Sequence, residues 1–217
     1  MKCSDIIQTI DDIYDHFSIP FFLRTHMKTV ASIGEFLCRY LDTDLDSDCI
    51  VAALLLHDLG NVVKFDLDSS LSKQLCSSKE KEQLQQLQSD LKVRYGKSAP
   101  EATKQMIEEL GVPDKIKWLV DNANWINIEN VRDGDSVELK ICAYADYRVS
   151  PKCIVSLEER LADLRRRYYD HPHTNQLSED EVEKRNVAYH DIEKQLFSKA
   201  DIAPDDITEE TISGNKL

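Results

Sequence analysis

The sequence has few residues that interrupt helices and no long apolar run. Only 6 glycines and 6 prolines occur among 217 residues, so there are few points at which a helix has to stop. No stretch approaches the ~18 consecutive apolar residues of a membrane span. The apolar stretch near the N-terminus carries acidic residues, which argues against a secretory signal. We therefore expect a soluble, cytoplasmic protein without membrane partners.

The sequence also lacks a surplus of positive charge. Lys and Arg number 27 against 40 Asp and Glu, and the net charge is −13. Binding along a nucleic-acid backbone depends on basic side chains that displace counterions, so extended nucleic-acid binding is excluded. A local basic pocket for a small anion remains compatible with this charge.

Paired cysteine motifs are missing as well. The six cysteines form no CxxC pair, and most lie inside apolar helical runs. This distribution favours small, reduced core residues over disulfide partners or zinc ligands. The prediction covers Cys3, Cys38, Cys49, Cys76, Cys142 and Cys153.

Apolar residues recur at spacings of three and four along most of the chain, which is typical of amphipathic helices. The sequence predicts an all-α, single-domain helical bundle over residues 1–200, followed by an acidic, mobile tail at 201–217. Gly60 is a plausible C-terminal stop for a deeply buried helix. The expected helices cover about 4–17, 20–41, 50–60, 78–95, 100–110, 113–123, 135–149, 156–169 and 178–200.

Four ligand-type side chains are predicted to face the interior of this bundle. His57 and Asp58 end the helix that is otherwise Val, Ala and Leu, where an unpaired polar group is costly. His26 precedes apolar residues at helical steps, and Asp146 follows apolar residues in the same way. Capping and carbonyl contacts alone could explain one His-Asp pair, but four such groups from three helices favour a shared cation.

The donor set indicates one divalent metal ion held by His26, His57, Asp58 and Asp146. Imidazole nitrogens and carboxylates suit Mn, Fe, Co, Ni or Zn, whereas Mg prefers oxygen ligands. Four protein ligands leave two positions of an octahedron for a water and a substrate oxygen. Such a metal could activate the water.

An upstream His, an adjacent His-Asp pair and a distant Asp resemble the HD superfamily of metal-dependent phosphohydrolases. The segment Leu-Leu-Leu-His-Asp-Leu-Gly-Asn at residues 54–61 carries the resemblance, which extends over about 20–170. It implies a helical core with the four ligands at its centre and hydrolysis of phosphate esters. The substrate is expected to be a small phosphorylated compound, with nucleotides among the candidates.

Catalysis of this kind needs positive side chains to hold the phosphate. The candidates near the ligands in sequence are Arg24, Lys64 and Arg148, and the expected catalytic set is Asp58, Lys64 and Arg148. Nucleotide-specific relatives carry an acidic residue where this chain has Asn61, so the proton-transfer residue stays unassigned.

Other interpretations remain open at this point. The rival to an enzyme is a non-catalytic HD fold, retained as a metal-stabilised binding or regulatory module. Oxygen-dependent di-iron chemistry is disfavoured because residues 59–145 contain no additional histidine. Trp118 and Trp125 fit aromatic core packing better than a base-binding wall. A homo-oligomer formed through the apolar N-terminal helix is not excluded by the sequence.

Overall fold

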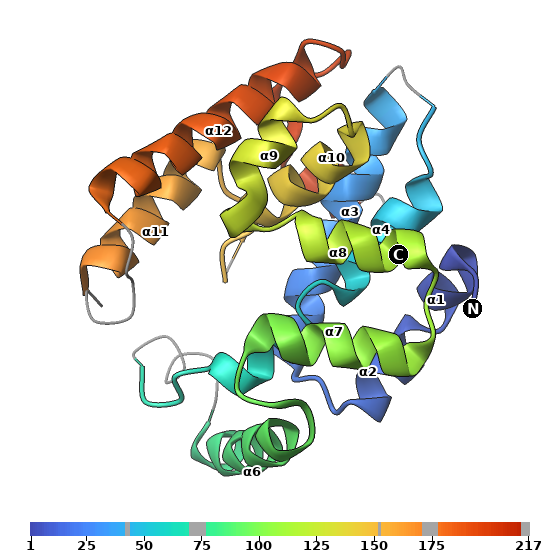
Figure 1. The fold of residues 1–217 in the computed structure, drawn as a ribbon, viewed down its shortest axis with the longest axis vertical. Coiled ribbons are helices and arrows are strands. Elements are labelled where there is room, and N and C mark those ends of the chain that lie inside the picture. Colours follow the sequence, from blue (N-terminus) through green and yellow to red (C-terminus); the bar gives the residue numbers. More distant parts are fainter. Residues whose placement is uncertain (42–43, 70–76, 152, 171–177, 214–217) are drawn as a thin grey trace.

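The computed structural model describes residues 1–41, 44–69, 77–151, 153–170 and 178–213. Within these ranges the chain forms helices and no strand, apart from isolated bridges between Leu41 and Ala200 and between Val149 and Ile154. The predicted all-α class is confirmed. Figure 1 shows the helices gathered around a central pair, α3 and α4.

Helix α4 (Ser47–Leu56) is the centre of the bundle. Every residue from Cys49 to Leu56 is buried, and α1, α3, α8 and α10 all pack against it. At its carboxyl end, the Tyr14 hydroxyl donates a hydrogen bond to the Leu55 carbonyl oxygen at 2.7 Å. A buried helix end needs such partners for its last carbonyl groups. His57 and Asp58 follow directly after this end of the helix.

The N-terminal region forms two short helices where one was expected over 4–17. These are α1 (Cys3–Gln8) and α2 (Ile10–His16), interrupted at Thr9, whose backbone leaves the helical region. Cys3 and Cys49 form a disulfide, so the prediction of six reduced cysteines is wrong for this pair. The two cysteines lie 46 residues apart on different helices, so their pairing could not be read from local spacing. Cys76 lies outside the described residues.

Helix α3 (Phe21–Tyr40) follows Pro20 and packs along α4. After the His-Asp pair, a 3₁₀ helix, η1 (Leu59–Lys64), continues the core with Leu59, Val62 and Val63 buried, and α6 (Ser78–Tyr95) packs on η1 at the periphery. Next come α7 (Ala99–Leu110) and α8 (Asp114–Asn122), close to the predicted boundaries. The short η2 (Trp125–Asn127) and α9 (Ile128–Asp133) were not predicted.

Gly60 is not the helix stop that the sequence indicated. Helix α4 ends at Leu56, and Gly60 lies inside η1, where α7 approaches its backbone. Its amide donates to the Thr103 hydroxyl at 2.9 Å. A Cβ at this position would lie 2.4 Å from the Thr103 nitrogen and 2.5 Å from the Ala99 oxygen. Glycine is therefore required here by close backbone contact, two residues after Asp58.

Replacing Gly60 with alanine is expected to lower the free energy of unfolding by about 2 kcal/mol, because backbone atoms of α7 cannot yield as a flexible side chain would. For a chain of this size the melting temperature should fall by roughly 5 °C. Asn61→Ala is the control for a change in the same turn. An unchanged melting temperature in Gly60→Ala would show that α7 moves freely.

The C-terminal third packs on the bundle through α10 (Val137–Tyr147), α11 (Leu157–Asp170) and α12 (Glu179–Phe197). Figure 1 shows α11 and α12 side by side along one side of the molecule. Ser178 and Glu181 form the predicted capping box of α12. None of the described helices combines the length and apolar character needed to cross a membrane.

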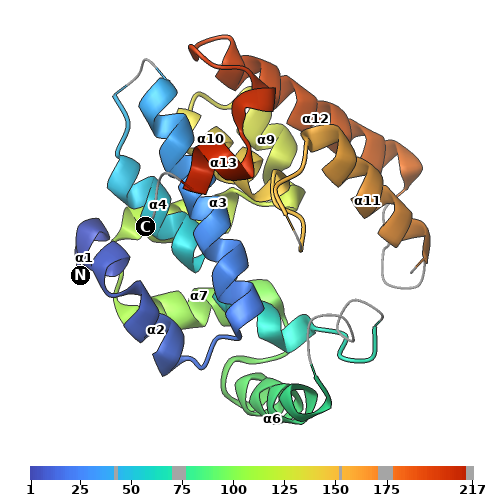
Figure 2. The same cartoon turned by 180° about the vertical axis from the view of Figure 1, so that it is seen from behind.

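The segment 201–212 is not a loosely attached tail, contrary to the sequence-based expectation. It contains η3 (Pro204–Asp206) and α13 (Glu209–Ser213), and Figure 2 shows α13 beside α3. Ile207 and Ile212 are buried at 2% and 5% exposure. The prediction of a mobile tail rested on the acidic composition of the segment and overlooked these two buried side chains. Residues 214–217 lie outside the described part.

Candidate metal centre

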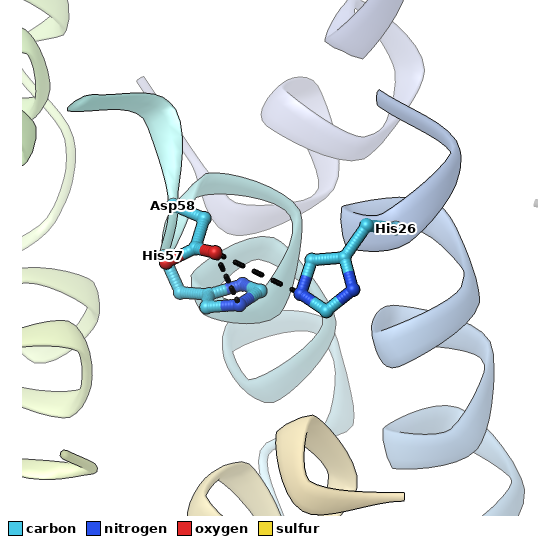
Figure 3. A group of neighbouring side chains, drawn as sticks. All are labelled: His26, His57 and Asp58. Carbon is cyan, nitrogen blue, oxygen red and sulfur yellow. Dashed lines mark ion pairs between the residues drawn. The ribbon is translucent and has the colours of Figure 1, made fainter. Parts of the chain in front are cut away.

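Three helices bring the predicted ligands together. His26 extends from α3, His57 and Asp58 follow α4, and Asp146 lies in the last turn of α10. Both α3 and α10 pack on α4, so residues far apart in sequence meet at its carboxyl end. Figure 3 shows the Asp58 carboxylate directed toward both imidazole rings.

The distances define a compact group. Oδ2 of Asp58 lies 3.7 Å from Nε2 of His26 and 3.7 Å from Nε2 of His57. Oδ1 of Asp146 lies 3.2 Å and 3.4 Å from the same two nitrogens. Ligand atoms of His26, His57 and Asp58 all fall within 4.8 Å of one another. Asp146 contacts both rings from the opposite helix.

The orientation of the His57 ring is fixed by the backbone. Its Nδ1 lies 2.7 Å from the Leu54 carbonyl oxygen, which can only accept, so Nδ1 carries a proton. Nε2 then presents a lone pair to the cluster when the ring is neutral. Within the described chain this buried Nε2 has no hydrogen-bond partner, although Asp146 lies nearby. An orphaned, buried nitrogen of this kind is a suitable metal ligand.

The charges of the cluster are strongly coupled. Burial disfavours the charged form of His57, but the carboxylates of Asp58 and Asp146 outweigh it and raise its pKa to about 9. Burial would raise the pKa of Asp146, yet His26 and His57 hold it well below its ordinary value. Two carboxylates beside two imidazoles are stabilised by a positive charge, which a bound cation would supply in place of protons on the imidazoles.

The residues present fit a divalent metal. The cluster offers two imidazole nitrogens and two carboxylates of the kind that first-row transition metals bind. The four side chains are 15–32% exposed, so the group is open to solvent on one side. That exposure is consistent with access for a water and a substrate.

A small cavity of about 20 Å³ adjoins His57 and Asp146. Its other walls are apolar side chains of α4, α8 and α10 together with Cys142. This volume holds about one water molecule. A larger groove of about 580 Å³ lies between the start of α3 and α6, but none of the four clustered residues lines it. We place the chemistry at the cluster because the ligand atoms converge there.

Arg24 does not serve the cluster, contrary to the sequence-based prediction. Its guanidinium donates to the Ile19 and Tyr14 carbonyl oxygens at 2.6 and 3.3 Å and to Asp15 at 2.5 Å. These bonds fasten the α2–α3 junction. Residues two apart on a helix point about 200° apart, so Arg24 cannot share the face of His26.

Arg148 is likewise a structural residue, and its predicted phosphate contact is corrected. It is only 3% exposed, and its guanidinium donates to the carbonyl oxygens of Val155, Pro204 and Ile207 and to the Tyr144 hydroxyl. The acceptors all belong to the fold itself. Arg148 therefore secures the C-terminal segment to α10. Lys64 ends η1 with an exposed side chain, and its phosphate contact stays a prediction.

The carbonyl contact that the sequence offered as an alternative explanation for His57 is present beside the cluster, with Leu54 as the acceptor. Leu54 lies three residues upstream, which is where the open carbonyl groups of a helix end are found. The sequence did not indicate the α8 side chains behind the cluster, Leu119 and Val120, because they come from a region without any ligand-type motif.

Comparison with known proteins agrees with this geometry. The family model for the HD domain matches residues 23–149, which is more than half of the chain and includes all four clustered residues. No match was found among curated proteins or among solved structures. HD domains are typical of metal-dependent phosphohydrolases. The matched segment, with His26, His57, Asp58 and Asp146 meeting inside a helical bundle, establishes that the chain belongs to the HD domain family.

Proposed function

We propose that the protein is a phosphohydrolase that uses one divalent cation to cleave a phosphate ester in a small phosphorylated compound. The observation that carries the proposal is the buried Nε2 of His57, oriented by the Leu54 carbonyl and surrounded by His26, Asp58 and Asp146. Mn, Fe, Co, Ni or Zn would suit this donor set better than Mg.

The chain's own groups would divide the work as follows. His26, His57, Asp58 and Asp146 would hold the cation, which when bound supplies Lewis-acid activation of water and of a phosphoryl oxygen. Asp58, whose Oδ2 lies equally far from both imidazoles, would also orient the attacking water. Lys64 could contact the phosphate from η1. The apolar wall behind His57 would limit access of bulk water.

The decisive experiment measures phosphate release by the full chain. Protein stripped with a chelator is reloaded separately with each of Mn²⁺, Fe²⁺, Co²⁺, Ni²⁺, Zn²⁺ and Mg²⁺ and offered nucleotides and sugar phosphates. We expect turnover that depends on the added cation, with elemental analysis giving about one ion per chain. Folded, metal-loaded protein that is inert on the whole panel would favour a binding or regulatory module.

A further inference from the structure

Three aromatic rings stack beside the cluster, starting at the residue after Asp146. Tyr147 of α10 and Tyr189 of α12 have ring centroids 3.7 Å apart. Trp125 of η2 lies 6.0 Å from each, nearly parallel to Tyr147. Both tyrosines are buried, whereas Trp125 is partly exposed. This ring stack joins α10, η2 and α12 at the residue next to Asp146.

Two arginines lie against the ring stack. The guanidinium carbon of Arg160, from α11, lies 6.0 Å from the Tyr147 ring centroid. That of Arg185, from α12, lies 5.3 Å from the Trp125 ring centroid. A cation placed over the face of an aromatic ring is attracted by the ring, so these contacts hold the two guanidinium groups in position. The arrangement places two positive groups at the ring stack on a chain whose net charge is −13.

Arg160 is the unusual member of the two, because part of its guanidinium group is buried without a hydrogen-bond acceptor. Within the described chain, its Nε and Nη1 atoms are buried and have no hydrogen-bond partner. Leaving a guanidinium unsatisfied in this way is costly, since each donor has lost its water. The side chain nevertheless keeps 13% of its surface exposed, so it is not sealed from solvent. An anion would provide the missing acceptors.

The nearby carboxylate does not fill this role. Oδ2 of Asp163 lies 3.9 Å from Nη1 of Arg160, beyond hydrogen-bond distance. Oδ1 of the same residue accepts from Nη2 of Arg166 at 2.6 Å. Asp163 therefore bonds to Arg166 and leaves Nη1 of Arg160 without a hydrogen bond.

The charges of Arg160 and of Asp146 both affect the pKa of the Tyr147 and Tyr189 hydroxyls. Burial raises the pKa of the Tyr147 and Tyr189 hydroxyls, the negative charge of Asp146 raises both further, and the positive charge of Arg160 opposes that increase. Tyr147 links Arg160 to the cluster, because it directly follows Asp146 in α10 and its ring centroid lies 6.0 Å from the guanidinium carbon of Arg160.

We propose that Arg160, held against Tyr147, binds a phosphate group of the substrate beside the cluster, with the Trp125–Tyr147–Tyr189 stack as the adjoining wall. This assignment rests on the proposed phosphohydrolase function and gives it the anion contact that Arg24 and Arg148 do not provide. Arg160 and Arg185 lie beyond the matched segment 23–149, so the site belongs to this chain's own C-terminal helices. Planar guanidinium groups bind phosphate oxygens in pairs.

The test uses the metal-free full chain and inorganic phosphate as the probe. A Trp118→Phe background leaves Trp125 as the sole tryptophan, so its emission reports on the ring stack. Phosphate is titrated at constant ionic strength against chloride. We expect Arg160→Gln to weaken phosphate binding at least tenfold and Arg160→Lys to weaken it less. Arg94→Gln removes an exposed guanidinium on α6 that pairs with Glu109 and does not contact Asp163, so this variant should bind phosphate as the parent does.

Circular dichroism establishes that each variant is folded. If Arg160→Gln is unfolded, the phosphate affinity of Arg160→Lys alone tests the assignment. Equal phosphate affinity in the parent and the folded Arg160 variants, or no phosphate binding by the parent, would overturn the assignment. With the metal-loaded enzyme, KM for a phosphate ester should rise about tenfold in Arg160→Lys while kcat stays within about twofold. Absence of turnover in the wild type would instead refute the hydrolase proposal, whatever the phosphate titration shows.

Discussion

Replacing Asp58 with alanine is expected to abolish tight binding of a divalent cation and to slow phosphate release by about a thousandfold or more, equivalent to about 4 kcal/mol in the barrier. The reason is geometric, because Asp58 Oδ2 lies 3.7 Å from the Nε2 atom of both imidazoles. Its loss removes one of two anionic ligands and the group that would orient the water. Calorimetric titration with Mn²⁺ and a phosphate-release assay measure the two effects.

Asp48→Ala is the matched control for this variant. Asp48 is an exposed carboxylate in the first turn of α4, at the opposite end of the same helix. Its replacement should leave cation affinity and turnover close to the wild type. Wild-type cation affinity in a folded Asp58→Ala protein would remove Asp58 from the ligand set.

Replacing Arg148 with alanine is expected to lower the free energy of unfolding by about 3 kcal/mol or more, since several buried acceptors lose their donor together. Three of them are the carbonyl oxygens of Val155, Pro204 and Ile207. The melting temperature should fall by roughly 10 °C. Denaturant unfolding and a thermal scan measure the change.

Arg166→Ala removes an exposed guanidinium from α11 and should change stability by less than about 1 kcal/mol. The phosphate affinity of folded Arg148→Ala protein should match that of the wild type. The reverse pattern, intact stability with lost phosphate affinity, would return Arg148 to the role that its sequence position first indicated.

Helices and their starts could largely be predicted, because short-range signals define them. The pair Ser178 and Glu181 begins α12 as expected. The start of α10 was displaced by one residue, since Ser136 rather than Asp135 provides the cap. Propensity could not separate Asp135 from Ser136, because Asp and Ser are both favoured N-cap residues.

The convergence of the four clustered residues was also predictable, because a polar side chain on an apolar helical stripe has to find a partner inside the bundle. The positions of the arginine side chains were not predictable. Proximity in sequence suggested Arg24 and Arg148, whereas helical geometry turns each away from its neighbouring ligand. Arg160 reaches the ring stack through the packing of α11 on α10, a long-range contact that no local spacing encodes.

The bond from the Tyr14 hydroxyl to the Leu55 carbonyl oxygen limits how far the chain can be truncated from its N-terminus without losing a support of α4. Tyr14 precedes the matched segment 23–149, yet it closes the helix that leads into His57. The Cys3–Cys49 link fastens the same region from outside that segment. A fragment trimmed to residues 23–149 would lack both supports, and we expect it to be less stable than the full chain.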